Sequence, residues 1–129
     1  MPYARIEIPA DWSLCPRPQL LQAVDAAFVT ALGVPPRDAF LRLFEYAPAD
    51  ALIPAWHGAH FIFIEIQLFA GRSLEAKRGL YRALVDQLEA LGIPGNDISI
   101  ALVEIPQQNW GLRGGQPGSE LDHGFVIER

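Results

Sequence analysis

The residue best placed to bind a charged small molecule is Arg72, in the segment GRSLEAK at residues 71–77. An apolar run precedes this segment and a helical pattern follows it, so Arg72 is expected where a strand leads into a helix. The first N–H groups of a helix have no partner within it, and a guanidinium can join them around a carboxylate. The sequence therefore predicts carboxylate binding at Arg72. The alternative is an ordinary exposed arginine at a helix start.

Two other patterns could indicate chemistry of a different kind. His57 and His60 have the H-x-x-H spacing, and Glu65 and His123 are further possible metal ligands. We expect no metal there, because the two histidines fall on a loop and a strand edge rather than on one helical face. The run GLRGGQPG at 111–118 lacks the lysine and the following helix of a phosphate-binding loop. We expect it to form the rim of a site.

The elements that position these residues come from an internal repeat. LGVPPRDAFLRLFE at residues 32–45 recurs as LGIPGNDISIALVE at residues 91–104, with the turn residues in register. Each copy follows a helical pattern and leads into an apolar strand, expected at 40–46 and at 98–105. The repeat also makes Asp97 the counterpart of Asp38.

A further strand precedes each helix. PYARIEI at residues 2–8 alternates apolar and polar residues, and FIFIEIQL at residues 61–68 is strongly apolar. Since strands joined through a helix lie parallel, the chain is predicted to be a duplicated β-α-β unit. The predicted organisation is a single domain over residues 1–129, with units at about 2–46 and 60–105 and a carboxyl-terminal rim at 106–129.

Both helical patterns carry an apolar stripe and end at glycine. The first ends at Gly33 and the second at Gly92, each followed closely by proline. Ser73 is expected to cap the second helix, with Glu75 in its first turn. The stripe of the second helix is expected to consist of Leu74, Tyr81, Leu84, Val85, Leu88 and Leu91.

The predicted fold class is α/β, or α+β: a four-stranded mixed sheet with two helices on one face. Two helices leave the other face of such a sheet uncovered. FIFIEIQLF at residues 61–69 is apolar on both faces for much of its length. Because large exposed apolar faces are rare on soluble monomers, we infer a homo-oligomer that packs sheets against one another.

Composition restricts the partners and the compartment. The net charge is −5 and the chain has no basic run, which argues against nucleic acid or an anionic membrane as a partner. The lone Cys15 forbids an internal disulfide, and no leader-like segment opens the sequence. We expect a cytoplasmic protein.

Several motifs together resemble the tautomerase superfamily. They are a proline directly after Met1, the duplicated β-α-β unit, GRSLEAK, and NWGLRGG at residues 109–115. The second half is similar to 4-oxalocrotonate tautomerase. The whole chain, with GVPPRD at residues 33–38, is more similar to the fused malonate semialdehyde decarboxylase branch. The resemblance implies a homotrimer in which the units pack around a pseudo-sixfold barrel, a small carboxylate substrate, and no cofactor or metal.

The same resemblance assigns roles at the start of the chain. It implies that Met1 is removed and that Pro2 becomes an amino-terminal secondary amine, the catalytic acid or base. Asp38 matches an aspartate that lies near this proline in the decarboxylases. A carboxylate there would raise the pKa of Pro2 and turn it from base to acid. We expect a catalytic role for Asp38 and a structural role for Asp97.

Substrate-binding residues follow from the resemblance as well. Arg72 takes the position of the carboxylate-binding arginine, and Trp110 matches an aromatic wall of the pocket. The decarboxylases carry a second arginine two residues earlier, where this chain has Ala70. Arg113 or Arg42 could supply the missing charge.

Three functions are therefore expected, in this order. The first is a keto–enol tautomerase in which Arg72 anchors an oxo acid, neutral Pro2 moves the proton and Trp110 shields the enolate. The second is decarboxylation or hydration of a 3-oxo acid by cationic Pro2 beside Asp38. The third is a non-catalytic ferredoxin-like ligand-binding domain, since that fold shares the β-α-β-β-α-β order.

Overall fold

Two β-α-β units follow one another in the computed structural model, which describes residues 1–124. The predicted strands and helices are all present, with bounds close to those expected from the sequence. Between the units runs a loop with a short 3-10 turn at Pro48–Asp50. The elements are β1 (Tyr3–Pro9), α1 (Arg17–Leu32), β2 (Phe40–Tyr46), β3 (Ile62–Phe69), α2 (Leu74–Glu89) and β4 (Ile98–Ile105).

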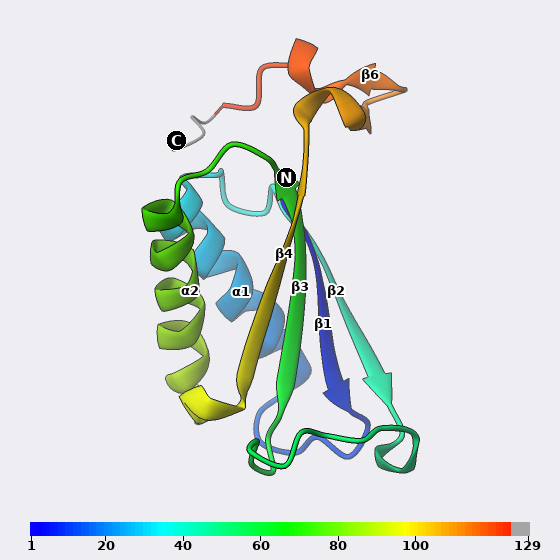
Figure 1. The fold of residues 1–129 in the computed structure, drawn as a ribbon, viewed down its shortest axis with the longest axis vertical. Helices are drawn as coiled ribbons and strands as arrows, with labels where there is room; N and C mark the ends of the chain where they lie inside the picture. Colours follow the sequence, from blue (N-terminus) through cyan, green and yellow to red (C-terminus); the bar gives the residue numbers. More distant parts are fainter. Residues whose placement is uncertain (125–129) are drawn as a thin grey trace.

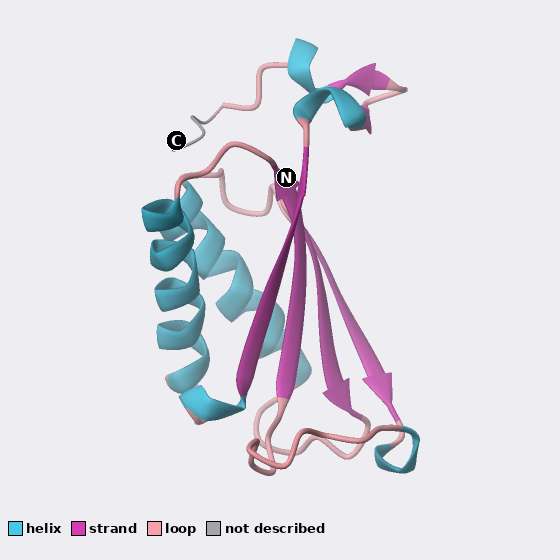
Figure 2. Cartoon of the chain, viewed as in Figure 1, coloured by secondary structure: helices cyan, strands magenta, loops and turns pink. Residues whose placement is uncertain are grey.

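The strands form one mixed sheet in the order β2-β1-β3-β4. The strands within each unit are parallel, as predicted, and β1 pairs with β3 antiparallel. Both helices lie on the same face of the sheet (Figure 1; Figure 2). Ile6 lies directly opposite Ile64 in the central antiparallel pair, which relates the two units by a local twofold axis.

The core lies between the sheet and the helices. Ala4, Ile6 and Ile8 of β1 are buried on the helix side, as their alternation predicts. The expected stripe on α2 needs correction, because Leu74 is 60% exposed at the start of the helix while Leu80 is fully buried. Leu80 lies one helical turn before Leu84, so it continues the row that faces the sheet. The buried residues of α2 are Leu80, Leu84 and Leu88.

The open face of the sheet differs from the expectation. The isoleucines of β3 all face the helices, and the residues between them are Phe63, Glu65 and Gln67. The middle of the open face is therefore partly polar rather than apolar. Its exposed apolar surface comes from the outer strands instead: Phe40 is 51% exposed, Phe44 39% and Val103 38%.

The register of the parallel strand pair differs between the two units, although the sequence repeat suggests that it is the same. Leu43 lies opposite Ile6, but the residue opposite Ile64 is Ile100 rather than Leu102. The turn sequences match while the strands that follow them are shifted along their ladders. Asp97 accordingly directly precedes β4, whereas Asp38 lies further ahead of β2.

The carboxyl-terminal segment forms a small hairpin beyond β4. A 3-10 turn at Gln107–Asn109 leads into β5 (Gly111–Leu112), which pairs antiparallel with β6 (Gln116–Pro117). The predicted rim at 106–129 thus includes this hairpin, and its last residues, 125–129, lie outside the described part. No helix within residues 1–124 has the length and apolarity needed to cross a bilayer.

Candidate active site

Strand pairing brings the start of the chain to the end of β3. Tyr3 lies opposite Gln67 in the β1–β3 ladder, so the residues ahead of Tyr3 reach the segment that follows β3. Arg72 lies in that segment, just before α2. Figure 1 shows the amino terminus beside the end of β3, below the hairpin. Residues that are far apart in sequence therefore meet at one end of the sheet.

A cavity of about 190 Å³ opens at the amino terminus. The amine of Met1 donates hydrogen bonds to Oδ2 of Asp38 at 3.0 Å and to the Asp38 carbonyl at 3.1 Å. Met1 is only 8% exposed. An amino-terminal ammonium is thus held beside a carboxylate at the cavity wall. The lining residues are Met1, Tyr3, Asp38, Leu112, Arg113, Leu121 and His123.

Arg113 is the sequence-predicted arginine that lines this cavity. It lies at the tip of the hairpin, where its backbone has a positive φ of 49° and turns β5 back toward β6. The cavity therefore has a guanidinium on its hairpin side and the Asp38 carboxylate beside the amino terminus. Arg42, the alternative considered from sequence, lies on the open face of the sheet, where its guanidinium covers the Phe40 ring at 4.8 Å.

Arg72 is buried at the start of α2. It is 7% exposed, which excludes the alternative of an ordinary exposed arginine. Ser73 caps the helix as predicted, because its hydroxyl accepts a hydrogen bond from Ala76 N at 3.1 Å. Arg72 lies at the same end of the sheet as Pro2 but does not line the cavity at Met1. Ala70, at the position of the family's second arginine, lines a neighbouring cavity of about 390 Å³.

Trp110 packs behind the amino terminus rather than lining the cavity. It is 8% exposed and clusters with Met1 and Phe69. Its ring meets those of Tyr3 and Phe69 edge to face, at centroid distances of 5.3 and 5.6 Å. Its indole Nε1 donates to the Ile105 carbonyl at 3.2 Å. Trp110 therefore forms an apolar backing behind Met1 and does not provide the pocket wall expected from the sequence.

Besides Met1, four lining residues were not predicted for this site: Tyr3, Leu112, Leu121 and His123. Tyr3 could have been proposed from sequence, since it directly follows Pro2 on the same strand. His123 was considered only as a possible metal ligand. It reaches the cavity because its Nε2 contacts the Gly118 carbonyl at 2.7 Å and its ring packs on Phe69. No local sequence pattern predicts that tertiary contact.

The histidines of the H-x-x-H pattern lie elsewhere. His57 stacks on Trp56, with ring centroids 3.5 Å apart, in the loop before β3. Within residues 1–124, no group of three or more His, Cys, Asp and Glu side chains is arranged to hold a metal ion. These histidines therefore do not contribute to the cavity at the amino terminus.

The family comparison and the sequence comparison both identify tautomerases as relatives of this chain. Residues 38–113 match the family model described as tautomerase enzyme. A 2-hydroxymuconate tautomerase from Comamonas testosteroni is 32% identical over 53 residues, which cover 40% of this chain and 84% of that protein.

Similar solved structures span nearly the whole chain. A malonate semialdehyde decarboxylase inhibited by 3-bromopropiolate is 29% identical, with a TM-score of 0.76, and the match covers 89% of this chain and 92% of that one. A fused 4-OT that forms a symmetric trimer is 30% identical, with a TM-score of 0.79, and the match covers 91% of this chain and 96% of that one. These relatives favour an enzyme over the non-catalytic ligand-binding alternative. With its duplicated β-α-β fold and a family match over more than half its length, the chain belongs to the tautomerase enzyme family.

Proposed function

We propose that this protein, once Met1 is removed, is a cofactor-independent enzyme that transfers a proton on a small oxo acid through the amine of Pro2. The observation that carries the proposal is the buried amino terminus, which faces a cavity between Asp38 and Arg113. An amine in such a place can exchange protons with a bound molecule. The cavity size suits a compact substrate.

Removal of Met1 leaves the Pro2 amine close to the position that the Met1 amine occupies in the structure. The nitrogens of consecutive residues are separated by three covalent bonds, a span of about 3 to 4 Å. The carbonyl of Pro2 accepts a hydrogen bond from Phe40 N at 3.0 Å, which ties the residue to β2. The freed amine would therefore face the cavity, with the Asp38 carboxylate close by.

The first candidate reaction is keto–enol tautomerisation. Neutral Pro2 accepts the enol proton and returns a proton to carbon, while a guanidinium holds the substrate carboxylate. Arg113 lines the cavity, and buried Arg72 lies at the same end of the sheet. Trp110 and Phe69 form an apolar backing behind the amine, which limits the access of water from that side.

The second candidate reaction is decarboxylation or hydration of a 3-oxo acid, and the position of Asp38 favours it. A carboxylate beside the amine favours the cationic form of Pro2. Cationic Pro2 would donate a hydrogen bond to the substrate carbonyl while the carbon–carbon bond to the carboxylate breaks and carbon dioxide leaves. In this reaction Arg113 would replace the family's second arginine, which is absent at Ala70.

Replacing Pro2 tests the shared basis of both reactions. We expect Pro2→Ala to lower the rate on a small oxo acid roughly 100-fold, the low end of what general acid–base groups contribute. The rates to measure are enol loss and carbon dioxide release by the purified enzyme. Pro94→Ala, in the turn between α2 and β4, is the matched control and should keep the parental rate. An unchanged rate in Pro2→Ala would contradict the proposal.

The pH dependence of the rate decides between the two reactions. If Pro2 is the acid, the rate falls as pH rises through its pKa; if it is the base, the rate falls as pH drops through that pKa. Asp38→Asn removes the charge that stabilises the cation, so the pKa of Pro2 falls and the inflection moves to lower pH. Asp86→Asn, at an exposed position of α2, is the control and should leave the inflection in place. An inflection that stays in place in Asp38→Asn would show that this carboxylate does not act on Pro2.

We also propose that the chain forms a homotrimer. One similar structure, the fused 4-OT, is a symmetric trimer, and this chain leaves aromatic side chains exposed on its open sheet face. Light scattering should give three times the chain mass of 14.2 kDa. Phe44→Arg should weaken assembly, whereas Leu52→Arg, at a fully exposed loop position, should not. A stable monomer at micromolar concentration would contradict the trimer.

A further inference from the structure

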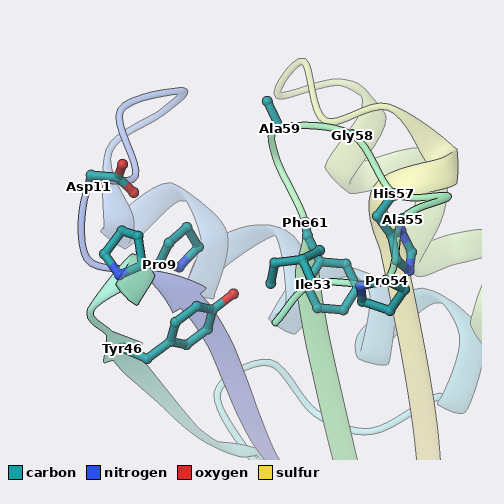
Figure 3. Close-up of a pocket in the computed structure, with 11 residues that line it drawn as sticks. Pro9, Asp11, Tyr46, Ile53, Pro54, Ala55, His57, Gly58, Ala59 and Phe61 are labelled. Atoms are coloured by element: carbon teal, nitrogen blue, oxygen red, sulfur yellow. The ribbon is translucent and has the colours of Figure 1, made fainter. Parts of the chain in front are cut away.

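A second cavity lies at the opposite end of the sheet from Pro2. Its volume is about 340 Å³, and its walls are the ends of β1 and β2 on one side and the loop before β3 on the other (Figure 3). We call it the far cavity. Most of its lining is apolar and comes from prolines, alanines, Ile53 and Phe61. The polar side chains of the lining are those of Asp11, Tyr46 and His57.

The far cavity is the counterpart of the active site under the local twofold axis. Because Ile6 lies opposite Ile64, the end where β3 begins corresponds to the end where β1 begins. His60 N donates to Oδ2 of Asp97 at 3.1 Å, much as the Met1 amine donates to Oδ2 of Asp38 at 3.0 Å. In the second unit the nitrogen is a backbone amide, which has no basicity. The far cavity therefore has the position of an active site without the reacting amine.

Asp97 also holds the loop that closes the far cavity. It is 2% exposed and accepts hydrogen bonds from the backbone N–H groups of Gly58 and His60. A Cβ added at Gly58 would come within 3.0 Å of both carboxylate oxygens, so the loop backbone must approach the carboxylate closely. This wall of the far cavity is thus fixed to the start of β4.

Two buried polar atoms at the far cavity have no hydrogen-bond partner within residues 1–124. They are the Tyr46 hydroxyl and Nδ1 of His57. Figure 3 shows the Tyr46 hydroxyl pointing across the cavity toward Ile53. The other ring nitrogen of His57 lies 3.5 Å from the Ser99 hydroxyl. Since buried polar groups are normally paired, these two atoms are unused hydrogen-bonding groups in the wall of the far cavity.

Among the described residues, Asp11 is the one carboxylate in the lining of the far cavity. Burial raises the pKa of Tyr46, and the charges of Glu7 and Asp11 raise it further. Tyr46 therefore keeps a neutral hydroxyl at physiological pH, and the carboxylate of Asp11 points toward the cavity in Figure 3. No lysine or arginine is among the lining residues. The charge of Asp11 is opposite to that of Arg113 at the active site.

We propose that the far cavity binds a small apolar molecule that carries an ammonium group. The ammonium would pair with the Asp11 carboxylate and donate to the Tyr46 oxygen, while the apolar body lies against Ile53 and Phe61. Pairing with a carboxylate selects the cation over an anion of the same shape. The proposal does not depend on the proposed function, because it uses no residue of the Pro2 site.

Three probes of similar size test the chemical class. They are phenethylamine, 2-phenylethanol and phenylacetate, titrated calorimetrically into the intact protein. We expect phenethylamine to bind at least tenfold more tightly than either of the others. Equal affinity for the amine and the alcohol, tighter binding of phenylacetate, or no binding of the amine at millimolar concentration would each overturn the proposal.

Variants then locate the bound amine. Asp11→Asn should raise the Kd for phenethylamine at least tenfold, and Tyr46→Phe should raise it severalfold. Asp50→Asn, on the neighbouring exposed turn and outside the lining, is the matched control and should leave the Kd unchanged. Far-ultraviolet circular dichroism and the unliganded Tm establish that each variant is folded. An unchanged Kd in folded Asp11→Asn would overturn the proposal.

Turnover separates this site from the Pro2 site. Because the cavities lie at opposite ends of the sheet, phenethylamine should not raise the KM for the oxo acid. Asp11→Asn should retain the parental turnover. Competitive inhibition by phenethylamine would place the amine at the Pro2 site and contradict binding in the far cavity. Failure of the proposed oxo-acid activity would leave the binding and variant measurements fully interpretable.

Discussion

The antiparallel pairing of β1 with β3 is the constraint on which the rest of the structure depends. It places Tyr3 opposite Gln67, and so brings the start of the chain to the segment that contains Arg72. Parallel pairing to β2 brings Asp38 to the same end, because β2 begins beside the start of β1. The hairpin beyond β4 then covers this end and supplies Arg113. A slip of one residue in the central ladder would turn the isoleucines of β3 away from the helices and shift the site as a whole.

The duplication gives the two ends of the sheet related architecture and different chemistry. At one end the Met1 amine faces the Asp38 carboxylate. At the other end the chain continues, so an amide nitrogen faces Asp97 and the loop is fixed in place. The lining side chains also differ between the two ends, with Arg113 at the first end and Asp11 at the second. One fold thus offers two cavities with different charged groups, and only the first has an amine at its wall.

Local patterns were sufficient to predict the elements, because alternation, helical spacing and glycine–proline stops act over a few residues. They did not predict properties that depend on tertiary pairing. The burial of Arg72, the contact of His123 with Phe69 and the loop held by Asp97 each require knowledge of which strand lies beside which. The expected apolar open face was correct only for the outer strands, for another reason. Glu65 and Gln67 alternate with the isoleucines of β3, so the face opposite the helices is polar in the middle of the sheet. The repeat likewise aligns the glycine, proline and aspartate of the two turns, but the strands that follow are shifted.

The proposed proton transfer depends most on the chemical state of the amino terminus, because an amide nitrogen at Pro2 has no basicity. The most direct measurement is intact mass spectrometry of the protein from its native host, with the terminal residue identified by fragmentation. We expect a chain that lacks Met1 and begins with a free Pro2 amine. A protein that retains Met1 throughout would contradict the proposed proton transfer, since the nitrogen beside Asp38 would then belong to a primary amine and Pro2 could transfer no proton.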